Sequence, residues 1–201
     1  MHMHSHPFNT SPLDPNLLST PFCTQTRWYV LTGAACVGKT TLLDALAERG
    51  YLVVPETARV YFETELAKGR TLPEIRREDA ALQRDILAMQ LSYERNAPVD
   101  QVAFLDRAVP DSLTFFRVFG LDPNTVLPHC FHHRYAGVFI LDRLPLHRDQ
   151  ILGPEDNAAS DFLDTWLEGD YASLGYQVMR VPVLPPDKRL AYVLQNLPAR
   201  K

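Results

Sequence analysis

The sequence is poor in the features that mark secreted, membrane-spanning and nucleic-acid-binding proteins. Its 201 residues include three cysteines, without the paired spacing of a disulfide framework or a zinc site. The apolar runs are strand-sized and the opening residues lack the apolar core of a signal peptide, so neither a membrane span nor a leader is predicted. Acidic residues outnumber basic ones, 24 to 20, which argues against a nucleic-acid partner. A cytoplasmic protein is expected.

What is present indicates one globular domain behind an unstructured lead-in. Hydrophobic residues make up 46% of the chain, and 201 residues suffice for one well-buried core. Residues 1–26 carry four prolines among many Asn, Ser and Thr residues, which predicts a flexible N-terminal arm. The histidine-rich opening is also typical of a tag remnant. Residues 27–201 form the predicted domain.

Apolar runs alternate with helical patterns along that domain. Strand-like runs cover residues 28–31, 51–54, 102–106, 137–142 and 177–181. Helical spacing follows Gly38 and recurs over residues 57–68, 73–96 and 187–196. Strands alternating with helices predict an α/β fold in which both faces of a parallel sheet are covered. Ligands of such sheets bind at the carboxyl ends of the strands, where Gly33, Glu56, Asp106 and Asp142 fall.

The strongest motif is the segment Gly33-Ala34-Ala35-Cys36-Val37-Gly38-Lys39-Thr40. It matches G-x-x-x-x-G-K-[ST] and stands between a strand and a helix, as a phosphate-binding loop does. The glycines let backbone N–H groups wrap a polyphosphate at a helix N-terminus. Lys39 adds a charge at the β- and γ-phosphates, and the Thr40 hydroxyl is a magnesium ligand. This loop and Thr41 predict binding of ATP with Mg²⁺; a tight turn beside a solvated lysine is the weaker alternative.

Acidic residues at two further strand ends extend this prediction. Asp106 is the candidate that holds magnesium together with Thr40, although aspartate also serves as a loop acid or helix cap. Glu56 is the candidate base for a substrate hydroxyl, or a ligand of that hydroxyl. Both are expected at the same mouth of the sheet.

Three arginines are candidates for contacting phosphate groups. Arg107 follows Asp106 directly and is predicted to reach the transferred phosphoryl group or the acceptor, with a plain surface role as the alternative. Arg59 holds an anion or orients Glu56, or else forms a surface ion pair of little energetic value. Arg148, with Arg143 as the alternative, lies in a segment predicted either to close over the nucleotide or to remain a solvated loop.

Together these segments resemble a known family. GAACVGKTTL, VVPETAR, the helix with Gln83 and Gln90, FLDRAVPDSLTFF and LGYQVMRVPVLPPDKRLAYVL are similar to the small AAA-type P-loop ATPases related to the ribosylnicotinamide-kinase domain of the NAD-biosynthesis regulator. The similarity covers about residues 27–198. It implies a three-layer P-loop NTPase fold with sheet order 2-3-1-4-5. It also implies a carboxylate base at Glu56, an acid–arginine pair at Asp106-Arg107 and a lid arginine, for which Arg148 is the candidate.

Two functions follow as hypotheses. The first is a magnesium-dependent kinase that transfers the γ-phosphate of ATP to a hydroxyl of a nucleoside-like acceptor, with Lys39, Glu56, Asp106, Arg107 and Arg148 as its catalytic residues. The second is a regulatory binding switch that depends on ATP or GTP and hydrolyses it slowly. The acceptor depends on the shape of the pocket and is not predicted by the motifs.

Overall fold

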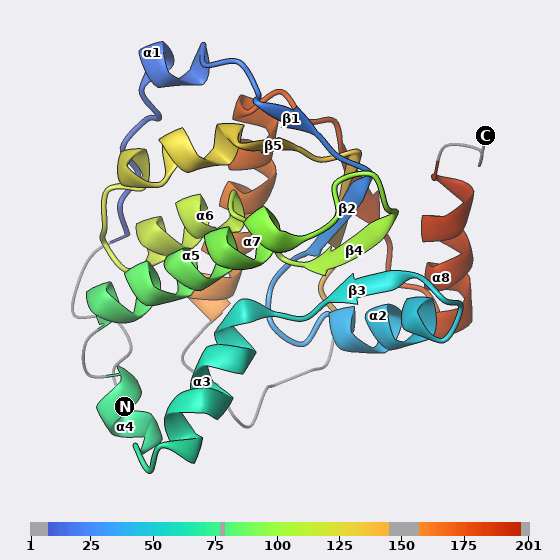
Figure 1. Cartoon of the computed structure of the whole chain (residues 1–201), viewed down its shortest axis with the longest axis horizontal. Helices are drawn as coiled ribbons and strands as arrows, with labels where there is room; N and C mark the ends of the chain where they lie inside the picture. Colours follow the sequence, from blue (N-terminus) through green and yellow to red (C-terminus); the bar gives the residue numbers. More distant parts are fainter. Residues whose placement is uncertain (1–7, 77–78, 145–156, 198–201) are drawn as a thin grey trace.

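The computed structural model describes residues 8–76, 79–144 and 157–197 of the chain (Figure 1). The strands are β1 Thr24–Gln25, β2 Trp28–Thr32, β3 Leu52–Val54, β4 Ala103–Asp106, β5 His133–Arg134, β6 Gly137–Leu141 and β7 Val178–Val181. The α-helices are α1 Pro15–Leu18, α2 Lys39–Ala47, α3 Thr57–Ala67, α4 Leu72–Ile75, α5 Asp79–Asn96, α6 Asp111–Val118, α7 Asn157–Ser173 and α8 Pro186–Gln195. Two short 3₁₀ helices, η2 Pro123–Thr125 and η3 Leu127–Phe131, follow α6. Among the helices in these ranges, none is both long and apolar enough to cross a bilayer.

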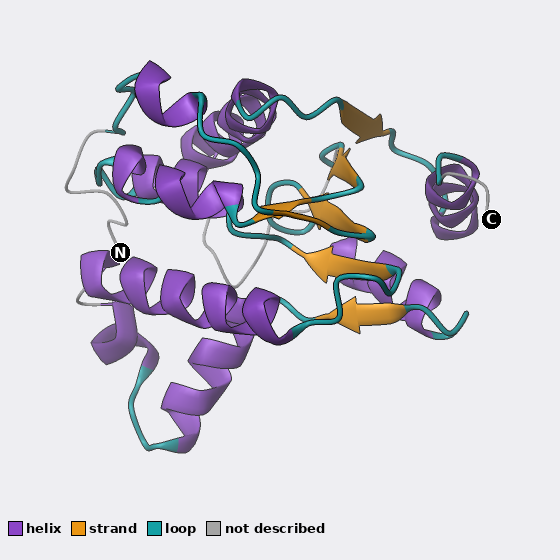
Figure 2. Ribbon diagram, turned by 45° about the horizontal axis from the view of Figure 1, so that its top comes forward, coloured by secondary structure: helices purple, strands orange, loops and turns teal. Residues whose placement is uncertain are grey.

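Five of the strands form one parallel sheet in the order β3-β4-β2-β6-β7 (Figure 2). Counted in chain order within this sheet, the order is 2-3-1-4-5, so the predicted fold class and topology are confirmed. Every residue of β2 and of β6 is buried, because these strands lie inside the sheet and both of its faces are covered. The strand β2, which leads into the phosphate loop, lies at the centre of this sheet.

The core divides into two layers, one on each face of the sheet. Trp28 and Val30 of β2 pack with residues of α5, α6 and α7. Tyr29 and Leu31, which alternate with them along the strand, pack with residues of α2 and α8 on the other face. Figure 1 shows these two groups of helices on opposite sides of the sheet. Because both faces of the sheet are covered, the residues that point to either face are apolar. Each inner strand is therefore a continuous apolar run in the sequence.

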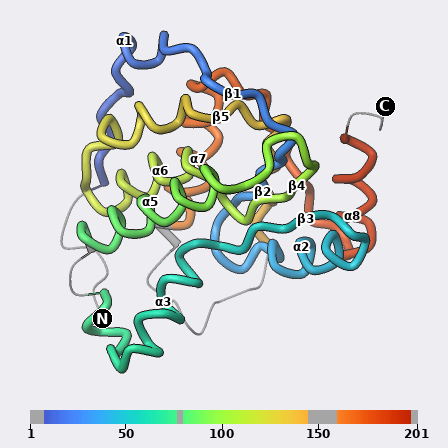
Figure 3. The backbone as a smooth tube through the Cα atoms, in the orientation of Figure 1, coloured from blue at the N-terminus to red at the C-terminus, as the bar shows by residue number. Residues whose placement is uncertain are grey.

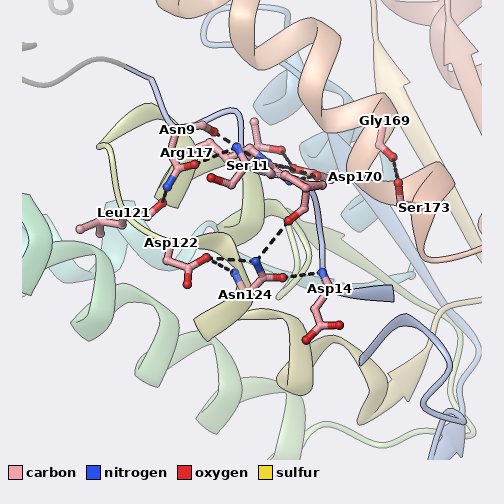
Figure 4. Close-up of polar contacts among 12 residues, drawn as sticks. Asn9, Ser11, Asp14, Arg117, Leu121, Asp122, Asn124, Gly169, Asp170 and Ser173 are labelled. Carbon is pink, nitrogen blue, oxygen red and sulfur yellow. Dashed lines mark hydrogen bonds and ion pairs between the residues drawn. The ribbon is translucent and has the colours of Figure 1, made fainter. Parts of the chain in front are cut away.

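Residues 8–26 do not form the flexible arm that the sequence predicts. Leu13 is buried in the core, and Phe8 lies against Phe162 of α7 with ring centroids 4.3 Å apart. Arg117 of α6 donates a hydrogen bond to the carbonyl of Asn9 at 3.3 Å, among the polar contacts that Figure 4 draws. Farther along, β1 pairs in parallel with β5, and Figure 3 traces this path from α1 into β2. The prediction fails because these contacts come from residues more than a hundred positions away in the sequence.

Two helices also differ from the sequence-based expectation. The helix expected over residues 73–96 is divided into α4, which begins one residue earlier, and α5. The helix α7 was not predicted, although Leu163, Leu167 and Tyr171 recur at helical spacing along it. It packs against α6 and covers one face of the sheet.

Candidate active site

The phosphate loop adopts a backbone conformation that demands its glycines. Gly33 and Gly38 have φ angles of +136° and +87°, and Cys36 also has a positive φ, of +56°. A Cβ atom at Gly33 would lie 2.9 Å from the carbonyl oxygen of Leu141, so the loop runs against the end of β6. Gly38 caps α2, which places the N-terminus of that helix at the loop. The backbone N–H groups and the helix dipole thus converge where an anion would bind.

Lys39 is buried at the start of α2, with 7% of its surface exposed. Its Nζ atom donates a hydrogen bond to the carbonyl oxygen of Ala34, 3.1 Å away within the same loop. Burial, helped by the charge of Arg107, lowers the pKa of Lys39 to about 8, against the opposing influence of Asp106 and Glu56. A bound polyphosphate would add negative charge beside Lys39 and favour its protonated form.

Asp106 stands at the end of β4, next to β2 in the sheet, and is 5% exposed. Its Oδ1 atom is buried and has no hydrogen-bond partner among the described residues. Burial raises the pKa of Asp106 to about 6, in spite of the charges of Lys39 and Arg107. A buried carboxylate oxygen without a partner is costly, and a cation or its water shell would satisfy it. With the exposed Thr40 hydroxyl at the start of α2, this fits the hard oxygen ligands that Mg²⁺ takes.

Arg107 is held inside the site by several groups. Its backbone has a φ of +68°, which is rare for a residue with a side chain. Its Nε atom donates to Oε1 of Glu56 at 2.9 Å, and Nη1 lies 3.3 Å from Oγ1 of Thr32 and 3.5 Å from Oδ1 of Asp111. The guanidinium also lies over the ring of Phe115, 4.8 Å from its centroid. Arg107 is therefore engaged within the protein, and its contact with the phosphoryl group or the acceptor stays a prediction.

Glu56 is the N-cap residue of α3, directly before Thr57, and faces the same site. Burial, the largest influence, acts to raise its pKa, but the charges of Arg107 and Lys39 outweigh it, so the pKa is lowered. Glu56 is therefore ionised at neutral pH. The ion pair with Arg107 fixes one oxygen, and among the described residues no hydrogen bond engages the other. The structure thus brings Glu56, Lys39 and Asp106 together, as the strand ends predicted.

The sequence did not reveal the importance of Asp111, the last residue of the D-R-x-x-P-D segment. This buried carboxylate accepts hydrogen bonds from the hydroxyl of Tyr171 at 2.6 Å and from the backbone of Ala108 at 2.9 Å. It also accepts one from the Thr32 hydroxyl and faces Arg107. Asp111 thereby joins β2, the loop after β4 and α7. Only its place in the motif gave a signal.

Arg189 of α8 was likewise missed. It is 4% exposed and donates to three carbonyl oxygens, those of Val37 in the phosphate loop, Pro182 at 3.0 Å and Asp142 at 3.2 Å. These carbonyls follow the ends of β2, β7 and β6. A single buried guanidinium thus ties the phosphate loop to the neighbouring strand ends.

The other predicted site residues lie around Lys39, Glu56 and Asp106 or outside the described part of the chain. Arg59 of α3 donates from Nη2 to Oγ1 of Thr40, 3.3 Å away. Arg143 forms an ion pair with Asp161 of α7. Arg148 lies outside the described residues. Within the loop, Ala34 and Val37 are buried, Ala35 is half-buried, and Cys36 and Thr41 are exposed.

Solved structures with this fold include several kinases. The NadR protein in complex with NR is 19% identical, with a TM-score of 0.62, covering 85% of this chain and 50% of that one. Thymidylate kinase from Ehrlichia chaffeensis is 13% identical, with a TM-score of 0.58, covering 88% of this chain and 100% of that one. Deoxyadenosine kinase from M. mycoides is 14% identical, with a TM-score of 0.58, and the match covers 85% of this chain and 98% of that one. The chain spans about half the length of the NadR structure that it matches.

No curated protein sequence matches the chain. The family model AAA_28, described as an AAA domain, matches residues 28–189, from the first residue of β2 to Arg189 in α8. This range holds the phosphate loop, Glu56, Asp106 and Arg107, and it is more than half of the chain. The resemblance inferred from the motifs is thus confirmed, and the chain belongs to the AAA_28 family of AAA domains.

Proposed function

We propose that this protein is a magnesium-dependent small-molecule kinase that transfers the γ-phosphate of ATP to a hydroxyl group. The observation that carries the proposal is the ionised Glu56, held by Arg107 2.9 Å away at the mouth that also contains the buried Lys39. A switch that only binds nucleotide has no need of a carboxylate poised there. The kinase fold of the similar structures gives further support.

The residues divide the reaction between them. The N–H groups of the phosphate loop and Lys39 bind the triphosphate, and they neutralise charge that develops on its oxygens. Thr40 and Asp106 are the residues that would hold Mg²⁺, which supplies further charge neutralisation at the β- and γ-phosphates. The carboxylate oxygen of Glu56 that Arg107 leaves open accepts the proton of the attacking hydroxyl. Arg107 keeps this carboxylate oriented and ionised.

The acceptor is proposed to be a nucleoside-like compound. The NadR structure holds NR, and the deoxyadenosine kinase structure holds the products dCMP and dCDP. In the present chain the half-buried ring of Phe115 lies beside Arg107, and an acceptor positioned at Glu56 would lie close to both. An aromatic ring and a polar carboxylate suit a ligand with a flat base and a hydroxylated sugar.

Replacing Glu56 with Gln tests the proposal. Phosphorylation of the acceptor should fall by at least about 100-fold, because the amide accepts no proton, while ATP affinity changes little. The measurement is transfer of labelled phosphate from ATP to a library of nucleoside-like metabolites, with Lys39→Ala as the blank. Glu63→Gln, an exposed carboxylate on the same helix α3, is the matched control and should retain full activity.

Two outcomes would contradict the kinase. Full phosphoryl transfer by Glu56→Gln would show that Glu56 is not the base. Labelling that persists in Lys39→Ala would show that the reaction does not depend on the phosphate loop. Slow hydrolysis that no acceptor accelerates would instead favour the nucleotide-dependent switch.

A further inference from the structure

Arg59 brings a positive charge to the phosphate loop from a separate element. It occupies the third position of α3, one helical turn after Glu56, and its Nη2 atom lies 3.3 Å from Oγ1 of Thr40. Both Arg59 and Thr40 are exposed to solvent. The charge of Arg59 is also one of the influences that lower the pKa of Glu56. The guanidinium therefore stands between the proposed base and the loop.

Two other described arginines near this loop, Arg107 and Arg189, already have several partners. Arg107 is bound by Glu56 and Asp111 and stacks on Phe115. The three carbonyl oxygens described above occupy Arg189. Arg59, by contrast, makes one long hydrogen bond within the described part of the chain, although a guanidinium has five N–H donors. Of Arg59, Arg107 and Arg189, Arg59 is the one with donors to spare in the described part of the chain.

Its one partner is a group that nucleotide binding engages. The Thr40 hydroxyl is the proposed magnesium ligand, so its lone pairs are claimed once nucleotide and metal are bound. The released guanidinium remains at the mouth, within reach of the outermost phosphate. A planar guanidinium matches the paired oxygens of a phosphoryl group and tolerates desolvation better than an ammonium group.

We propose that Arg59 binds the γ-phosphate of ATP and stabilises it during transfer, in the place that the sequence assigned to Arg107. This inference rests on the proposed kinase function for the transfer step. In that step the acceptor oxygen forms a bond to the γ-phosphorus, and the bond from phosphorus to the β,γ-bridging oxygen breaks. ADP leaves, and the proton of the acceptor hydroxyl passes to Glu56. Arg59 touches the reacting group and is in this sense catalytic.

The test is the difference in affinity between nucleotides with and without a γ-phosphate. In the Arg59→Ala variant, affinity for a non-hydrolysable ATP analogue with Mg²⁺ should fall about tenfold, which corresponds to about 1.4 kcal/mol. Affinity for ADP with Mg²⁺ should stay within about twofold, because ADP lacks the group that Arg59 binds. Both constants are measured by isothermal titration calorimetry on the full chain.

Two further variants make the result decisive. Arg49→Ala removes an exposed arginine at the far end of α2, where Nη1 donates to the Ala45 carbonyl, and should change neither affinity. Arg59→Lys keeps the charge without the planar fork and should recover only part of the lost affinity. Equal losses for both nucleotides, or none for either, would overturn the proposal. Because no acceptor is present, this result is independent of whether the kinase proposal holds.

Discussion

At the scale of single residues, the site holds several charged groups away from water. The clearest case is Asp106, whose buried Oδ1 atom has no hydrogen-bond partner in the described part of the chain. Burial raises its folded-state pKa to about 6, from an ordinary value of 3.8. As the pH rises between these two pKa values, the Asp106 carboxyl loses its proton in the unfolded chain before it does so in the folded protein. The carboxylate therefore lowers the free energy of unfolding progressively between about pH 4 and pH 6, and the loss persists above that range.

Asp106→Asn should remove this penalty. We expect the variant to be about 2 kcal/mol more stable than the parent protein at pH 8 without metal or nucleotide, and nearly equal to it at pH 4. Urea denaturation at the two pH values measures the difference. The same variant should lose the Mg²⁺-dependent part of its ATP affinity. A stability gain that is identical at both pH values would show that the carboxylate charge is not its cause.

The residues of the phosphate loop were predictable because their roles depend on neighbours in the chain. Gly33, Gly38 and Lys39 act through a turn and a helix N-terminus that the motif itself encodes. The position of Arg107 was not predictable in the same way. Its side chain is directed by Asp111 and Glu56, and the ion pair with Glu56 joins residues 51 positions apart. The sequence located this arginine at the site but did not predict its ion pair with Glu56.

At the scale of elements, α8 controls the phosphate loop through Arg189. Its buried guanidinium donates to carbonyl oxygens in the loop and after β6 and β7. Arg189→Met should leave these carbonyls without their donor, and a lost buried hydrogen bond to a charged group costs about 1.5–3 kcal/mol. We expect stability to fall by about 3 kcal/mol and ATP affinity to fall by about tenfold or more, because the loop is less firmly held.

Thermal denaturation and nucleotide titration together check this prediction. Lys188→Ala, on an exposed neighbouring position of the same helix, is the control that should leave both quantities unchanged. Unchanged ATP affinity in a folded Arg189→Met protein would limit Arg189 to a structural role.

The elements themselves were predictable where local pattern and global fold agree. The five strands of the main sheet are short apolar runs that end at Gly, at Pro or at acidic residues, and all were located. The pairing of β1 with β5 was not, because two-residue strands carry no periodicity and their partners are more than 100 positions apart. The helix α7 was not predicted either, because it follows a segment with Gly153 and Pro154 that is typical of a loop.

At the scale of the whole molecule, the segment from Phe8 to Leu18 closes one side of the core and stabilises the domain that carries the site. Leu13 is buried, Leu17 and Leu18 pack against the same cluster, and the backbone of Asn9 accepts a hydrogen bond from the buried Arg117. Arg117 in turn pairs with Asp170 of α7 at 3.0 Å (Figure 4). Its guanidinium also lies over the ring of Trp166. The segment is therefore anchored to helices that cover the sheet.

Removal of residues 1–13 should lower the free energy of unfolding by about 3 kcal/mol, because Leu13 and the carbonyl partners of Arg117 are lost together. Leu13→Ala alone should cost about 2 kcal/mol, the lower end of the range for a buried leucine near the surface. Asn16→Ala, an exposed position in α1, is the control expected to change stability little. Because none of these residues lies in the phosphate loop, ATP affinity should persist in the folded fraction of each variant. Urea denaturation followed by nucleotide titration separates the two effects, and a truncated chain as stable as the parent would return this segment to the role of a flexible arm.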